Sequence, residues 1–203
     1  PLGELIALGH DTPGGDYSCL DEGQHAVRSI APHIIVNAGA HTAVDEAESE
    51  PDLARQLNPQ APAMLAFEAK RLDAWLVHYS TDYVFDGSGS TPWVETDATN
   101  PLNIYGQTKA ESETAIREAG CQYLTFRTSW VYAARGGNFA KTMLRLGQER
   151  DTLTVIDDQI GAPTGADLLA DVTAHALRTA QHRPEGAGLY HLVAGGETSW
   201  HGY

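Results

Sequence analysis

Trp75-Leu-Val-His-Tyr-Ser-Thr-Asp82 is a short apolar run that ends in polar residues, and it decides the fold. An apolar run of this length is typical of a strand that is buried on both faces of a parallel sheet. The next long periodic segment, Asn103–Ala119, is predicted to be a helix, and Tyr123–Phe126 is predicted to be the strand after it. Strand, helix and strand in this order form the repeating unit of a parallel sheet covered by helices.

The same alternation extends in both directions along the chain. We expect further strands at Leu5–Leu8, His33–Val36, Leu153–Ile156 and Tyr190–Val193. We expect further helices at Leu20–Ile30, Pro51–Leu72, Phe139–Glu149 and Ala166–Thr179, with weak points at Pro59 and Pro62. The pattern predicts an α/β fold with a Rossmann-like, doubly wound parallel sheet. Ligands of such sheets bind beyond the carboxyl ends of the strands.

Tyr105 and Lys109 form the motif Tyr-Gly-Gln-Thr-Lys within the predicted helix Asn103–Ala119. Residues four apart on a helix share one face, so the lysine cation is expected beside the phenol. This charge would lower the phenol pKa, which is normally about 10, and make Tyr105 a proton donor near neutral pH. The hydroxyl of Thr81, at the end of the preceding strand, would complete a group of residues suited to reducing a carbonyl.

Composition excludes several kinds of protein. The 203 residues, 42% hydrophobic and 20% charged, suffice for one sizeable core or for one domain and part of another. We expect no membrane partner and a cytoplasmic location, because neither a signal peptide nor an apolar run of about 18 residues is present. The net charge of −14 argues against a nucleic-acid partner. Cys19 and Cys121 are expected to be reduced.

Five segments, in this order, resemble the extended short-chain dehydrogenase/reductase superfamily and, within it, the dTDP-4-dehydrorhamnose reductase family. They are Val36–Glu48, Ser80–Gly87, Pro101–Lys109, Arg127–Tyr132 and Asp158–Gly165. The resemblance implies NAD(P)H-dependent reduction of the C4 ketone of dTDP-4-dehydro-6-deoxy-L-mannose to dTDP-L-rhamnose. Two alternatives stay open. One is a non-catalytic regulatory subunit of the methionine adenosyltransferase type, and the other is a sugar-nucleotide epimerase or dehydratase.

The resemblance also implies roles for individual residues. Tyr105 would protonate the C4 oxygen, Lys109 would tune Tyr105 and hold the nicotinamide ribose, and Thr81 would bond the carbonyl or Tyr105. The dTDP-sugar site would include Thr81, Asp82, Tyr83 and Trp130. The NADH or NADPH site would include Tyr105 and Lys109, together with Asp16, Tyr17, Ala38, Gly39 and Ala40.

Two features of the chain depart from the family pattern or are less specific. The family opens with a strand and a Gly-rich phosphate-binding turn, whereas this chain begins at what resembles the second strand. We therefore expect residues 1–203 to form one incomplete dinucleotide-binding domain with interleaved parts of a smaller C-terminal sugar-nucleotide-binding lobe. By themselves these residues are expected to bind a dinucleotide poorly and to be inactive. Some members bind Mg²⁺ with carboxylates at a homodimer contact. Asp167 falls at one such position, but we favour an ordinary helix N-terminal acid.

Overall fold

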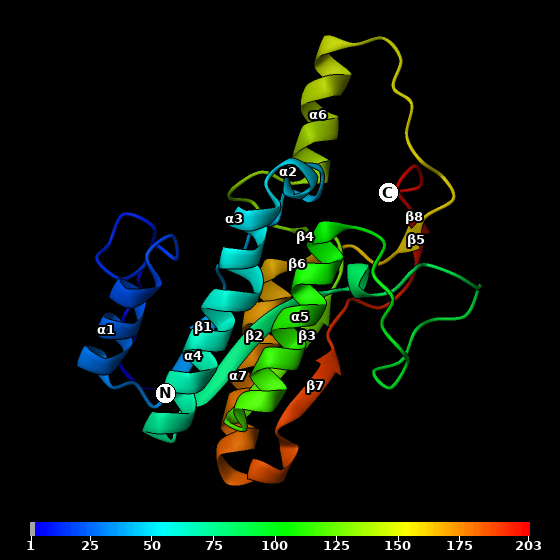
Figure 1. Ribbon diagram of the computed structural model, residues 1–203. Helices are drawn as coiled ribbons and strands as arrows, with labels where there is room; N and C mark the ends of the chain where they lie inside the picture. Colours follow the sequence, from blue (N-terminus) through cyan, green and yellow to red (C-terminus); the bar gives the residue numbers. More distant parts are fainter. Residues whose placement is uncertain (1–2) are drawn as a thin grey trace.

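The computed structural model describes residues 3–203, and its main sheet has four parallel strands. Across the sheet the strands are β1 (Ile34–Asn37), β2 (Trp75–Thr81), β3 (Gln122–Thr128) and β7 (Gly188–His191) (Figure 1). Neighbouring strands pair in parallel throughout. Their carboxyl ends therefore meet at one edge, where the polar residues after each strand gather.

Helices cover both faces of this sheet (Figure 1). One face carries α1 (Leu20–Ile30), α4 (Ala61–Leu72) and α5 (Ile104–Ala119), and the other carries α7 (Ala166–His182). The remaining helical elements are α2 (Val44–Ser49), α3 (Pro51–Arg55), the π-helix η1 (Gln56–Gln60), η2 (Asp82–Val84), α6 (Phe139–Glu149) and η3 (Pro184–Gly186). Two small sheets pair β4 (Val131–Tyr132) with β6 (Thr164–Gly165), and β5 (Ile160–Gly161) with β8 (Thr198–Ser199).

Strand β2 supplies the core on both faces, because successive side chains of a strand point to opposite sides. Leu76 packs with Leu65 and Ile116 beneath α4 and α5. Its neighbour Val77 packs with Leu177 of α7 on the opposite face. The doubly wound parallel sheet predicted from the sequence is therefore confirmed.

Two of the predicted strands are wrong. Residues 5–8 and 153–156 pair with no strand in the described part of the chain, and Leu5 and Ile156 are 88% and 52% exposed. A strand is stabilised by its neighbour's hydrogen bonds, which an apolar run cannot supply by itself. The long helix predicted over Pro51–Leu72 is interrupted where expected, because η1 contains Pro59. The other predicted strands and helices are confirmed, with ends that shift by up to three residues.

Packing around β2 gives a prediction on stability. Leu76→Ala should lower the free energy of unfolding by about 3 kcal/mol, because it removes a fully buried side chain from a close-packed cluster. Leu144→Ala is the matched control, since Leu144 on α6 is 72% exposed, and it should change stability by less than about 0.5 kcal/mol. Urea unfolding of the three proteins measures both effects. Equal losses in the two variants would contradict this assignment of the core.

Candidate active site

Lys109 is buried in the middle of the structure, where only 2% of it is exposed. From α5 its Nζ reaches β2, lying 2.5 Å from the carbonyl oxygen of Tyr79 and 3.2 Å from Nε2 of His78. Burial lowers the pKa of Lys109 to about 7, although the charge of Glu113 works in the opposite direction. Lys109 can therefore gain and lose a proton near neutral pH.

Tyr105 lies one helical turn before Lys109, near the carboxyl end of β2. Its ring packs edge-on against that of Tyr83, with 5.6 Å between ring centroids. Burial raises the pKa of Tyr105 to about 12, the charge of Asp82 adds to this rise, and a hydrogen bond with Thr81 opposes it. The predicted lowering of this pKa by Lys109 is wrong for this structure, because the Lys109 amine is directed to Tyr79 and His78.

Thr81 and Asp82 lie at the carboxyl end of β2. The Thr81 hydroxyl donates to Asp82 Oδ1 over 3.0 Å and accepts from the backbone N–H of Tyr83 over 3.2 Å. Burial raises the pKa of Asp82 to about 6. Thr81, Asp82, Tyr83 and Tyr105 are therefore brought together as the sequence predicted.

A glycine allows this close approach. A Cβ on Gly106 would lie only 2.1 Å from the carbonyl oxygen of Tyr83, so no larger side chain fits between α5 and η2. The side chain of Asn103 caps the same end of α5 by accepting from the Gly106 N–H over 2.7 Å. The glycine and the cap together fix where Tyr105 meets η2.

A buried ion pair lies beside the site and was not predicted from the sequence. Arg127 of β3 donates two hydrogen bonds to Glu113 of α5, of 2.9 and 2.7 Å, and the Ser80 hydroxyl donates to the same carboxylate. Pairing of this quality is needed to offset the cost of burying two charges. The signal in the sequence was weak, because a Glu one turn after Lys109 is equally typical of an exposed helix face.

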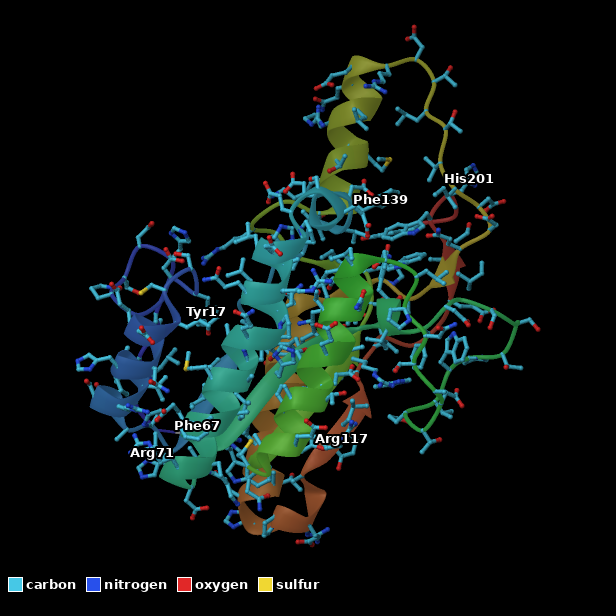
Figure 2. The ribbon with its side chains drawn as sticks, in the orientation of Figure 1. Tyr17, Phe67, Arg71, Arg117, Phe139 and His201 are labelled. Carbon is cyan, nitrogen blue, oxygen red and sulfur yellow. The ribbon has the colours of Figure 1, made fainter. Side chains whose placement is uncertain are left out.

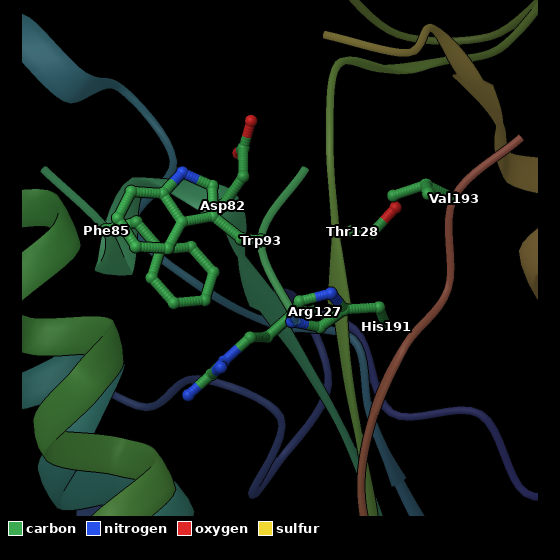
Figure 3. A pocket seen from close by; sticks show the side chains of 7 residues that line it. All are labelled: Asp82, Phe85, Trp93, Arg127, Thr128, His191 and Val193. Carbon is green, nitrogen blue, oxygen red and sulfur yellow. The ribbon is translucent and has the colours of Figure 1, made fainter. Parts of the chain in front are cut away.

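The guanidinium of Arg127 also lies over the ring of Phe85, 4.9 Å from its centroid. Phe85 stacks in turn on Trp93 at 4.6 Å, and these three residues line a small pocket of about 80 Å³ (Figure 3). Asp82, Thr128, His191 and Val193 complete its walls. The pocket is thus continuous with the end of β2 through Asp82.

Trp130 lies apart from Tyr105, in a second aromatic group. Its backbone has a φ of +47°, a left-handed conformation that is costly for a bulky residue. The indole stacks on Trp200 with 3.7 Å between centroids, and a Cβ on Gly161 would lie 2.6 Å from it. Phe139, at the base of the projecting helix α6, packs on Trp200 at 4.5 Å (Figures 1 and 2). This packing holds Trp130 in its strained conformation.

The residues after β1 form a separate part of the same edge. Ala38 and Gly39 are exposed and Ala40 is half-buried. A Cβ on Gly39 would lie 2.8 Å from the ring of Tyr17, so a glycine is required for the tyrosine to pack there. Asp16 accepts from the Ser18 N–H over 2.8 Å, which lowers the pKa of its carboxyl.

Asn58 joins this edge to α5 and was also missed in the sequence. Its side chain, on the π-helix η1, accepts from the backbone N–H of His41 over 2.9 Å and donates to the His41 carbonyl over 3.1 Å. The same amide donates to the Thr108 hydroxyl over 3.0 Å. Thr108 lies next to Lys109 on α5. A π-helical turn of this kind is frequent at functional sites.

Neither a metal centre nor a membrane span is found in residues 3–203. No group of three or more His, Cys, Asp and Glu side chains in this range could hold a metal ion. Asp167 is exposed in the first turn of α7, where a negative charge complements the helix dipole. None of the helices described has both the length and the apolar character needed to cross a membrane.

The class of protein follows from this geometry. A parallel sheet with helices on both faces, and a Tyr–Lys helix packed at the carboxyl end of a central strand beside Thr81, define an extended short-chain dehydrogenase/reductase. The family model described as "RmlD substrate binding domain" matches residues 4–203. The chain belongs to the dTDP-4-dehydrorhamnose reductase family.

Individual relatives carry that name. The chain is 60% identical to the dTDP-4-dehydrorhamnose reductase of Shigella flexneri and 58% identical to that of Escherichia coli K12, over its whole length and 69% of theirs. Among solved structures, the enzyme from Clostridium acetobutylicum matches with a TM-score of 0.84 and 37% identity, over 91% of this chain and 64% of that one. The Bacillus anthracis enzyme in complex with NADP matches with a TM-score of 0.84 and 38% identity, over 91% and 65%. The chain thus spans about two thirds of its relatives' length.

The buried amine gives a prediction on pH and stability. The pKa of Lys109 is lowered in the folded state, so between about pH 7 and 10 the unfolded chain keeps a proton that the folded protein has lost. The free energy of unfolding should therefore rise with pH in this range, by on the order of 2–4 kcal/mol relative to Lys109→Met.

Denaturant unfolding at a series of pH values measures this difference. The exposed Lys70 supplies the control, and Lys70→Met should keep the pH dependence of the unaltered protein. If Lys109→Met and Lys70→Met showed the same dependence, Lys109 would not be the group responsible.

Proposed function

We propose that the protein reduces the C4 ketone of dTDP-4-dehydro-6-deoxy-L-mannose to dTDP-L-rhamnose with NADPH or NADH. The observation that carries the proposal is the position of Tyr105 and Lys109 on α5, with Thr81 at the facing end of β2. The relatives named dTDP-4-dehydrorhamnose reductase, among them that of Shigella flexneri at 60% identity, support the same activity.

In this proposal Tyr105 is the general acid. Its hydroxyl is protonated at neutral pH, and burial raises its pKa to about 12. The transfer is still favourable, because the alkoxide that forms on C4 is a stronger base than the phenolate. The Tyr105 O–H bond breaks as the proton passes to the C4 oxygen, and the ketone becomes an alcohol. When bound, the reduced nicotinamide supplies the hydride that C4 receives. Thr81 lies where its hydroxyl can orient the carbonyl or Tyr105.

The residues at the end of β1 and on α5 fit the adenine end and the nicotinamide ribose of a dinucleotide. Because Ala38, Gly39 and Ala40 are small, a cofactor can approach the protein backbone closely at the end of β1. The ring of Tyr17 closes one side of this place. Asp16 and Tyr17 would hold the adenine end, and Lys109 with Tyr105 the nicotinamide ribose. The relative from Bacillus anthracis in complex with NADP supports a nicotinamide dinucleotide as the cofactor class.

The sugar nucleotide is proposed to lie between the aromatic pair Tyr83 and Tyr105 and the stacked pair Trp130 and Trp200. Asp82 and Tyr83 border Tyr105 directly and are placed to contact the sugar. Trp130 offers a flat apolar wall and one N–H donor. Its strained backbone, held by Trp200 and Gly161, is consistent with a residue whose position serves binding rather than folding.

Tyr105→Phe tests the proposal in the intact protein. Removing the positioned acid should lower kcat for NADPH oxidation with the dTDP-4-keto sugar by about 10²–10⁴-fold. Binding of NADPH, followed by fluorescence titration, should change little. The control Tyr190→Phe removes the hydroxyl of an exposed tyrosine on β7 and should keep full turnover.

Two results would contradict this account. Full turnover in Tyr105→Phe would remove Tyr105 from the role of acid. If the unaltered protein bound NADPH but failed to oxidise it with this sugar, the substrate itself would be wrong.

A further inference from the structure

The small pocket between the ends of β2, β3 and β7 presents mostly carbon atoms, although several of its residues are polar. The stacked rings of Phe85 and Trp93 form one wall, and Val193 lies on the side facing them (Figure 3). Phe85 is only 7% exposed, and Trp93 is half-buried. The carbon atoms of these rings and of the valine side chain form no hydrogen bonds with a ligand.

Arg127 borders the same pocket, but its donors are directed elsewhere. Its Nε and Nη2 donate to Glu113 over 2.9 and 2.7 Å, and Nη1 lies 3.5 Å from the carbonyl oxygen of Glu95. The flat face of the guanidinium covers the ring of Phe85. The arginine therefore closes the pocket without offering it a free N–H group.

The remaining polar atoms are buried or paired. The hydroxyl of Thr128 and Nε2 of His191 are buried atoms, so neither is presented at the surface of the pocket. Asp82 lines the pocket from the end of β2, where its Oδ1 accepts from the Thr81 hydroxyl over 3.0 Å. A group that enters beside Asp82 therefore meets a nearly apolar surface.

The size of the pocket limits what it can hold. A cavity of about 150 Å³ binds benzene, so a pocket of about 80 Å³ has room for about three carbon atoms. A nucleobase or a whole sugar ring is too large for it. A methyl group together with the carbon that carries it fits.

The position of the pocket identifies the methyl group. In the proposed reaction, C4 of the sugar lies at Tyr105 and Thr81, and the pocket begins at Asp82, the next residue along β2 and η2. The ring neighbours of C4 are C3, which carries a hydroxyl group, and C5, which carries a methyl group. Of these two substituents, only the methyl group matches an apolar pocket.

We propose that the pocket formed by Phe85, Trp93 and Val193 receives the C5 methyl group of the sugar and thereby selects 6-deoxy sugar nucleotides. This inference rests on the proposed function and adds specificity-determining residues to it. Burial of the methyl group should strengthen binding about fourfold. A hydroxyl group on the same carbon would lose its hydrogen bonds to water without gaining a partner, which should weaken binding by about 10–100-fold.

Binding of two product sugars to the intact protein tests this selection. dTDP-L-mannose differs from dTDP-L-rhamnose only by the hydroxyl group on C6. Isothermal titration calorimetry is done with NADPH present, because the reduced cofactor cannot react with an alcohol product. The Kd for dTDP-L-mannose should be about 10–100-fold higher than that for dTDP-L-rhamnose. Equal affinities would overturn the inference.

Two substitutions of Val193 assign the preference to the pocket. Val193 is 45% exposed, so neither change removes a core side chain. Val193→Phe fills the pocket and should weaken dTDP-L-rhamnose at least about tenfold, while dTDP, which lacks the sugar, binds as before. Val193→Thr keeps the shape but adds a hydroxyl group, and it should narrow the preference between the two sugars. Val94→Phe is the matched control, since Val94 is 50% exposed and next to Trp93, and it should leave all affinities unchanged.

The outcomes separate this inference from the proposed function. An unchanged affinity of Val193→Phe for dTDP-L-rhamnose, or a loss of NADPH binding in its place, would overturn the inference alone. A protein that shows the methyl preference but does not oxidise NADPH with the keto sugar would refute the proposed function alone. Failure of the unaltered protein to bind either sugar nucleotide would refute both.

Discussion

The contact of Lys109 with β2 is the constraint on which the rest of the site depends. A lysine amine with 2% exposure must find hydrogen-bond partners inside the protein, and it finds them in the Tyr79 carbonyl and His78. This contact fixes the position of α5 along the central strand β2. Tyr105, one turn earlier, is then placed where Thr81 ends β2. The same burial lowers the pKa of Lys109 to about 7.

Other contacts also fix the position of α5 against the sheet. Gly106 lets the start of the helix approach Tyr83, and Asn58 connects Thr108 to the loop after β1. The pair of Arg127 with Glu113 ties the same helix to β3. Two strands, β2 and β3, and the loop after β1 therefore contribute to the position of one helix. A substitution at any of these contacts is expected to affect the site as well as stability, since buried polar networks are costly to break in part.

Much of the fold was predictable, because apolar runs and apolar residues at helical spacing indicate which side chains are buried. The helix around Tyr105 and the strand at Trp75 followed from those patterns, and the Tyr105–Lys109 motif lies near Thr81 as expected. The strand predicted at Leu5–Leu8 was wrong, because pairing depends on a neighbour that an apolar run does not encode. The predicted shift of the Tyr105 pKa was also wrong in direction. The spacing of two residues on a helix does not determine which groups the end of a long lysine side chain contacts. His78 was missed as a polar residue in an apolar strand, because its contact with Lys109 joins a strand to a helix distant in the sequence.

The most direct test of the account is the fate of the hydride. The intact protein is given the dTDP-4-keto sugar and NADPH deuterated at the transferable position of C4 of the nicotinamide, and the sugar nucleotide is analysed by mass spectrometry and NMR. The account predicts one deuterium on C4 of the product sugar and one equivalent of oxidised cofactor. An isomerised sugar without deuterium, and with no net oxidation of the cofactor, would contradict it and indicate an epimerase.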